Sequence, residues 1–71
     1  MFDEAIGDCN RLIDINEENA AAYYIRGCAF QKLNEEELCI ADFTRVLQID
    51  PTHVNAAYAK GAAENKRGNY L

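Results

Sequence analysis

Hydrophobic side chains recur along the chain with the three- and four-residue spacing of amphipathic helices. Short polar segments separate four such stripes. The spacing predicts an all-α chain with about four helices, over residues 2–15, 20–33, 36–49 and 54–67. Helices of about 14 residues are marginal on their own, so their stability must come from packing the stripes together.

Polar residues at the stripe boundaries predict where the helices begin and end. Asn19 can accept from freed N–H groups at the start of the second helix, and Asn34, with Glu three positions later, resembles a capping box for the third. Thr52 or His53 can cap the fourth, and Pro51 keeps the residue before it out of the helical region. Residues 68–69, Gly-Asn, are typical of a helix-ending turn, after which residues 70–71 would begin a fifth helix.

The chain also repeats itself at a fixed offset of 34 residues. The identical pairs are Ile6 and Ile40, Asp8 and Asp42, Arg11 and Arg45, Ile15 and Ile49, Ala22 and Ala56, Tyr24 and Tyr58, Gly27 and Gly61, and Ala29 and Ala63. A period of about 34 indicates stacked helix-turn-helix units. A glycine inside a helix costs about 1 kcal/mol relative to alanine, so we expect helices to approach closely at Gly27, and Gly61 at the same phase supports this.

The residues from Tyr23 to Pro51 resemble the tetratricopeptide repeat family. The family pattern is W-x2-L-G-x2-Y, then A-x3-F, then P. This chain has Tyr23-x2-Arg26-Gly27-x2-Phe30, then Cys39-x3-Phe43, then Pro51. Half-copies flank it, Ala5-x3-Cys9 before and Ala57-x2-Lys60-Gly61-x2-Glu64 after. The resemblance implies structural roles for Tyr23, Gly27, Phe30, Cys39, Phe43, Pro51 and Gly61.

This resemblance implies antiparallel helix-turn-helix repeats stacked as an α-α superhelix within one domain, 1–71. Residues 1–16 would be the second helix of a preceding repeat, and residues 20–53 a complete repeat. Residues 54–71 would be the truncated first helix of a following repeat. The chain would then be a piece of a longer array.

The resemblance also implies that the first helix of each repeat lines a concave groove that binds a peptide or protein segment. The matching positions are Ala21, Tyr24, Cys28, Gln31, Lys32, Asn55, Tyr58, Ala62, Asn65 and Lys66. Tyrosines suit interfaces, so we expect Tyr24 and Tyr58 to form one aromatic ladder there, although both could instead pack between helices. Family members that capture a terminal carboxylate place Lys and Asn where this chain has Tyr24, Cys28, Tyr58 and Ala62, so that clamp is absent.

Composition narrows the partner classes. The net charge is −5, from 12 acidic and 7 basic residues without a basic cluster, which disfavours nucleic acid. No apolar run reaches 18 residues, so no membrane partner is expected. No signal peptide precedes Phe2, and the three cysteines lack a CxxC spacing. Reduced thiols in an intracellular, cytoplasmic protein are the simplest interpretation.

The residues offer little for catalysis, so we expect no enzyme, no cofactor and no metal. There is no serine, and His53 is the only histidine. Cys9 and Cys39 fall on apolar stripes, where thiols behave as small hydrophobic groups. The acids of residues 16–19 and 35–37 lie in turns and suit solvated capping roles. The sequence therefore favours a non-catalytic protein-interaction module. The alternative is a structural spacer or self-association element whose scaffold binds its partner elsewhere.

Overall fold

The computed structural model describes residues 2–68. These residues form four α-helices and no strand: α1 (Phe2–Ile15), α2 (Ala20–Lys32), α3 (Glu36–Ile49) and α4 (Val54–Lys66). Every boundary lies within one residue of the prediction. The expected fifth helix at residues 70–71, and Asn69 of the predicted turn, lie outside the described residues.

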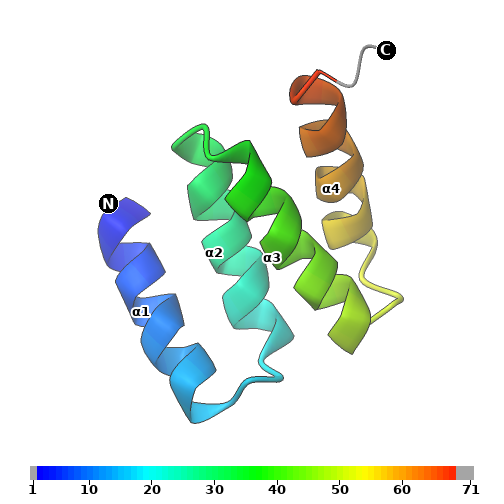
Figure 1. Cartoon of the computed structure of the whole chain (residues 1–71). Coiled ribbons are helices and arrows are strands. Elements are labelled where there is room, and N and C mark those ends of the chain that lie inside the picture. The colour runs from blue at the N-terminus through cyan, green and yellow to red at the C-terminus, as the bar shows by residue number, and fades with distance from the viewer. Residues whose placement is uncertain (1, 69–71) are drawn as a thin grey trace.

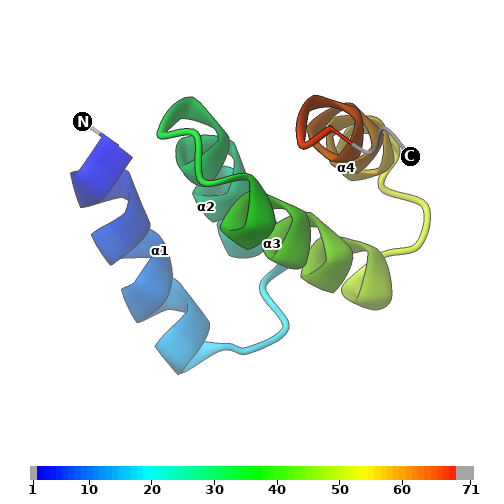
Figure 2. The same ribbon diagram turned by 45° about the horizontal axis from the view of Figure 1, so that its top comes forward.

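The helices lie side by side in chain order and alternate in direction, as Figures 1 and 2 show from two angles. The main contacts are between neighbours in sequence, α1 with α2, α2 with α3 and α3 with α4. The result is an elongated slab of 40 × 27 × 15 Å. This is the expected all-α arrangement of antiparallel helix-turn-helix units.

Two of the three predicted N-caps are confirmed. The Asn19 side chain accepts a hydrogen bond from the Ala22 N–H at 3.1 Å, at the start of α2. Nδ1 of His53 accepts from the Ala56 N–H at 3.0 Å, at the start of α4. Each cap satisfies one N–H that has no partner inside its helix.

The predicted capping role of Asn34 is wrong. Asn34 has a φ of 61°, in the left-handed region, and it ends α2 instead of beginning α3. Its N–H donates to the Gln31 carbonyl, and the Glu35 N–H donates to the Phe30 carbonyl, which is a Schellman ending. The N-cap of α3 is Glu35, whose side chain makes no capping hydrogen bond. Gly68, with a φ of 83°, takes the same place after α4, so that part of the predicted turn is confirmed.

The core centres on α3. Phe43, Val46 and Cys39 are fully buried there, and Tyr23 of α2 packs against them. A Cβ on Gly27 would lie 2.8 Å from Cε1 of Phe43, so the glycine makes room for this ring. The predicted close approach at Gly27 and the predicted burial of Phe43 are both confirmed.

Residues at equivalent positions, 34 residues apart, differ in how well neighbouring helices bury them. Gly61, unlike Gly27, has no neighbouring atom within 4 Å of its would-be Cβ among the described residues. Leu12 is 45% exposed, whereas its repeat equivalent Val46 is fully buried. The internal repeat is packed on both sides, while the outer faces of α1 and α4 have no helix against them in the described part of the chain.

Candidate functional site

The ten residues predicted to line the groove all lie on the first helix of a helix-turn-helix unit. We call them the groove surface. Ala21, Tyr24, Cys28, Gln31 and Lys32 lie on α2. Asn55, Tyr58, Ala62, Asn65 and Lys66 lie on α4. Tyr24, Cys28 and Gln31 are half-buried, whereas the other seven are exposed. The α4 half therefore offers more accessible surface than the α2 half.

Tyr24 is fixed in place by two other rings. Its centroid lies 5.7 Å from that of Phe43 and 4.9 Å from that of His53, both in tilted geometry. Partial burial raises the pKa of its hydroxyl above the ordinary value of 10.0, and the neighbouring Cys28 thiol raises it further. Tyr24 thus joins the start of α4 to the core and still leaves part of its ring accessible. The contact with His53 was not foreseen from the sequence.

Tyr58 has a different environment from its repeat equivalent. Tyr58 is 79% exposed, and its ring makes no contact with that of Tyr24 in the described structure. It borders an open depression of about 400 Å³ on α4, lined also by Ala57, Gly61, Ala62 and Asn65. The structure therefore brings Tyr58, Ala62 and Asn65 together as predicted. The expected pairing of both tyrosines in one ladder stays a prediction.

Lys66, predicted at the groove edge, is tied to the turn between α2 and α3. Its Nζ donates to Oδ1 of Asn34 at 3.0 Å and lies 3.4 Å from Oε2 of Glu36. These contacts hold the C-terminal end of α4 against the turn between α2 and α3. Lys32, also predicted at the groove edge, is exposed at the end of α2.

The chain matches a known repeat family. The tetratricopeptide repeat model matches residues 20–53. Residues 20–53 are therefore a tetratricopeptide repeat. The segment includes all of α2 and α3 with their connecting turn, the two helices that form the core described above. Tetratricopeptide repeats are interaction modules that bind other proteins.

Curated relatives match a similar stretch of the chain. Peptidyl-prolyl cis-trans isomerase FKBP4 of Homo sapiens is 36% identical over 52 residues, which cover 73% of this chain and 11% of that protein. The Bos taurus protein of the same name is 35% identical over 52 residues, with the same coverage. FK506-binding protein 59 of Drosophila melanogaster is 35% identical over 54 residues, which cover 76% of this chain and 12% of that protein. The chain thus spans about a ninth of these relatives, whose isomerase name describes much longer proteins.

Arg26 departs from the leucine of the repeat pattern and forms a charged network that the sequence did not predict. Its Nε and Nη2 donate to the two carboxylate oxygens of Asp42 at 2.8 and 2.7 Å. Nη1 of Arg45 donates to Oδ1 of Asp42 at 2.8 Å, and Nη1 of Arg26 reaches Oδ1 of Asn10 on α1 at 2.8 Å. Asp42 is fully buried, so these bonds stabilise a carboxylate that would otherwise be costly in the core.

One sequence signal pointed toward part of this network. Asp8 with Arg11 repeats as Asp42 with Arg45, at the same spacing of three residues, and both pairs form ion pairs in the structure. The bond from Arg26 joins residues 16 positions apart on different helices, which periodicity does not reveal. Hydrogen bonding to Asp42 raises the pKa of Arg26 above its ordinary value, so the guanidinium keeps its charge.

The three cysteines are free thiols, and two of them are unsuited to nucleophilic chemistry. Burial, together with the nearby Cys28 and Glu36, raises the pKa of Cys39 to about 11. Burial also raises the pKa of Cys9 above 9.0. Since the thiolate is the nucleophile, both groups are poorly reactive at neutral pH.

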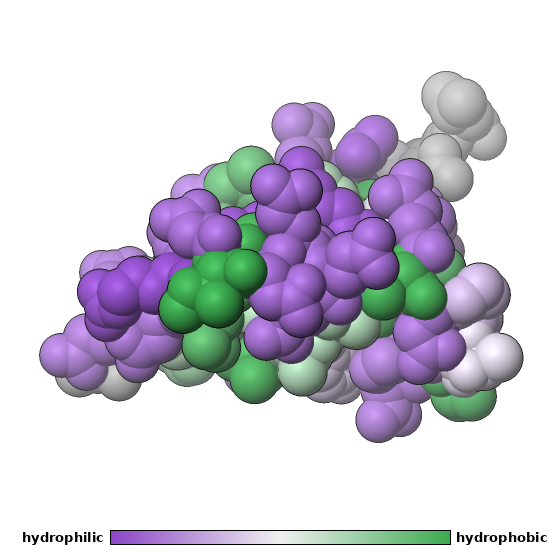
Figure 3. Space-filling model, turned by 90° about the horizontal axis from the view of Figure 1, so that it is seen from below, coloured by the Kyte–Doolittle hydropathy of each residue, from purple (hydrophilic) through white to green (hydrophobic). Residues whose placement is uncertain are grey.

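The exterior is mostly polar at the end that carries the α1–α2 and α3–α4 turns. In Figure 3, which views that end, hydrophobic side chains form separate patches among hydrophilic ones. Within the described residues, no helix combines the length and hydrophobicity that crossing a bilayer requires. Residues 2–68 also contain no group of three or more His, Cys, Asp or Glu placed to hold a metal ion.

Proposed function

We propose that the groove surface of α2 and α4 binds an extended or helical segment of a protein partner. The observation that carries the proposal is the exposure of Tyr58, 79% of whose surface is accessible beside a depression that also holds Ala62 and Asn65. Its repeat equivalent Tyr24 packs against Phe43 and His53, whereas no helix covers Tyr58 in the described part of the chain. Tyrosine supplies apolar contact area and a hydrogen-bonding hydroxyl, which are the properties that interface hot spots use.

The chemistry of this surface suggests what the segment contains. Tyr24, fixed by Phe43 and His53, provides a rigid aromatic floor, and preorganised surfaces lose less entropy on binding. Lys32 at the edge favours acidic residues beside the apolar anchors of the partner. Positions 24, 28, 58 and 62 carry Tyr, Cys, Tyr and Ala, so a free C-terminal carboxylate is not the expected feature.

Peptides selected from a display library on residues 1–71 test the proposal. For a selected peptide, Tyr58→Ala and Tyr24→Ala should each weaken binding by about 2 kcal/mol, measured by titration calorimetry. Tyr58→Ala should leave the free energy of unfolding nearly unchanged. Tyr24→Ala should cost less stability than Phe43→Ala, for which we expect a loss of about 3–5 kcal/mol.

Ile25→Ala provides the matched control, because Ile25 lies on α2, is 49% exposed and is outside the groove surface. It should bind like the parent chain. The proposal fails if selected peptides bind the two tyrosine variants as tightly as the parent. It also fails if every selected peptide requires a free C-terminus.

Self-association is a second candidate function, favoured by the uneven coverage of repeat-equivalent positions. Leu12 of α1 and Gly61 of α4 are uncovered, whereas their repeat equivalents Val46 and Gly27 are packed. Asp8 is the repeat equivalent of Asp42, and Lys60 is that of Arg26, so the two could form the corresponding ion pair. The α1 of one copy could therefore pack on the α4 of another as α3 packs on α2. Sedimentation equilibrium should then show mass rising with concentration, with Asp8→Lys and Lys60→Glu each preventing this and the double variant restoring it.

A further inference from the structure

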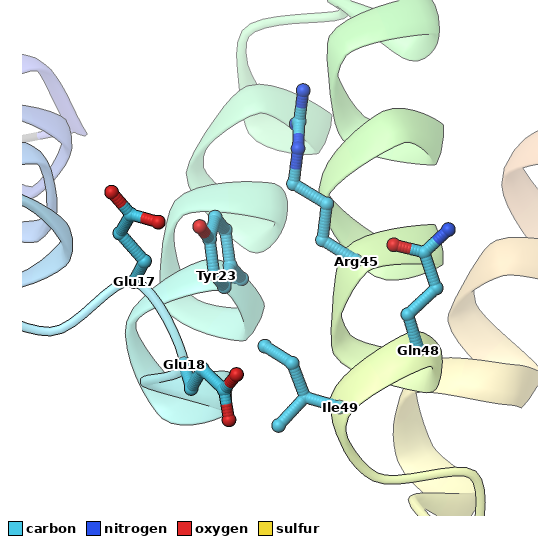
Figure 4. Close-up of a pocket in the computed structure, with 6 residues that line it drawn as sticks. All are labelled: Glu17, Glu18, Tyr23, Arg45, Gln48 and Ile49. Atoms are coloured by element: carbon cyan, nitrogen blue, oxygen red, sulfur yellow. The ribbon is translucent and has the colours of Figure 1, made fainter.

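A second recess lies between the α1–α2 turn and the C-terminal half of α3. It has a volume of about 470 Å³ and is lined by Glu17, Glu18, Tyr23, Arg45, Gln48 and Ile49, drawn in Figure 4. We call it the turn pocket. It shares no residue with the groove surface, so neither the family resemblance nor the proposed function accounts for it.

Two carboxylates of the turn pocket have no partner among residues 2–68. Glu17 and Glu18 are exposed, and no side chain among the described residues donates a hydrogen bond or forms an ion pair to either carboxylate. The Glu18 backbone N–H donates to Oδ1 of Asn16 at 3.0 Å, which fixes the turn while leaving the carboxylate unpaired. Exposed acids alone are common, so the case for a site depends on what lies beside them.

The hydroxyl of Tyr23 is a further polar group of the turn pocket. Tyr23 is nine-tenths buried, its ring lies 5.5 Å from the Arg26 guanidinium and 6.0 Å from that of Arg45, and its hydroxyl makes no hydrogen bond in residues 2–68. No buried side-chain nitrogen or oxygen in the described structure lacks a partner, so this hydroxyl must reach solvent. The turn pocket, which Tyr23 lines, provides that opening. A rigid, unpaired phenol oxygen therefore faces the same space as the two carboxylates.

The charge balance of the pocket is negative. Arg45 is directed to Asp42, and Asp42 also binds Arg26, so these three groups together carry one positive charge. Glu17 and Glu18 add two negative charges. The pocket is therefore acidic by one charge, on a chain whose net charge is −5. A cation would be attracted to it and would find unpaired acceptors there.

We propose that the turn pocket binds a cationic side chain, preferably arginine, from a protein segment. A guanidinium has five N–H donors in one plane and can reach several acceptors at once, whereas an ammonium is a compact point charge. Its donors match the carboxylates of Glu17 and Glu18 and the hydroxyl oxygen of Tyr23. The aliphatic stem of the arginine would lie against Ile49.

N-acetyl-arginine amide is a suitable probe, because the guanidinium is its only charge. Titrated into residues 1–71, it should cause saturable shifts of the Glu18, Tyr23 and Gln48 amide signals in proton–nitrogen NMR spectra. A single side chain should bind weakly, with a Kd of about 1–10 mM. The citrulline analogue has almost the same shape without the charge and should cause no saturable shift.

The double variant Glu17→Gln, Glu18→Gln should raise the Kd about fivefold or more, because each lost ion pair contributes up to about fivefold. Tyr23→Phe should raise it about twofold, because it removes the acceptor but keeps the ring. The matched control is Glu35→Gln, Glu37→Gln, which changes the net charge equally and should leave the Kd unchanged. These two acids are exposed at the start of α3, and Glu36 and Glu37 lie in that helix rather than in the turn that the sequence suggested. Circular dichroism confirms that each variant is folded.

Four outcomes would overturn the assignment. The control pair could weaken binding as much as the pocket pair, which would indicate general charge attraction. The citrulline analogue could bind equally well, or the shifts could map to Tyr24 and Tyr58 instead. Finally, no saturable shift could appear up to the solubility limit of the probe. None of these results depends on whether the groove surface binds a partner.

Discussion

Gly27 and Gly61 hold the same position in successive repeats but should respond in opposite ways to alanine. Both lie inside helices, where alanine is favoured over glycine by about 1 kcal/mol. At Gly61 no atom lies within 4 Å of the new methyl group. Gly61→Ala should therefore stabilise the chain by about 1 kcal/mol and raise Tm by about 4–8 °C.

At Gly27 the same methyl group would lie 2.8 Å from Cε1 and 3.1 Å from Cδ1 of Phe43. Phe43 is fully buried, so its ring has little room to move. Overpacking of this kind costs about 1–3 kcal/mol, which offsets or exceeds the gain in helix propensity. Gly27→Ala should therefore lower stability by up to about 2 kcal/mol.

Urea unfolding of the parent and both variants, followed by circular dichroism, measures the effect. Because the propensity gain is common to both variants, the difference between their free energies of unfolding gives the overpacking cost directly. We expect that difference to be about 1–3 kcal/mol. The reasoning is refuted if Gly27→Ala stabilises the chain as much as Gly61→Ala does.

Two further predictions concern the buried polar groups. Arg26→Leu restores the residue of the repeat pattern but leaves Asp42 in the core with Arg45 alone, so it should cost about 3–5 kcal/mol in urea unfolding. Adding Asp42→Ala should recover most of that loss, and no recovery would contradict the explanation. Cys39 has a pKa of about 11 against an ordinary 9.0. Below pH 9.0 the thiol is protonated in both states and its stabilising contribution is complete, whereas from 9.0 toward about 11 the unfolded chain loses the proton first and stability falls. Cys39→Ala should show a shallower decline over that range, and an identical decline would place the cause elsewhere.

The sequence was sufficient to predict the helices because each helix end is set by residues close to it in the chain. The hydrophobic stripes and the caps at Asn19 and His53 act within one turn, so local pattern was sufficient. Asn34 was misassigned because asparagine suits both an N-cap and the left-handed residue that ends a helix. Gly61 repeats the local sequence of Gly27, but nothing among the described residues packs against it, so the repeat pattern alone does not show which glycine is in contact.

The candidate sites were predictable only in part. The phase of Tyr58, Ala62 and Asn65 on one helix predicted their shared surface, because residues three and four apart lie on one face. The turn pocket brings Glu17 beside the far end of α3, and that proximity depends on how helices pack rather than on spacing along the chain. The position of Tyr24 against His53 has the same origin. Contacts between elements therefore account for most of what the sequence did not reveal.

The bonds of Arg26 suggest the order in which the helices come apart. Releasing α1 gives up one bond to Asn10, an exposed residue, and uncovers only one buried side chain of that helix, Cys9. Separating α2 from α3 would instead strand the carboxylate of Asp42 inside the protein. Local opening should therefore begin at α1, and amide hydrogen exchange should be fastest there and slowest in α3. Because the α1–α2 turn forms one wall of the turn pocket, that pocket would open and close with α1 while the groove surface persists.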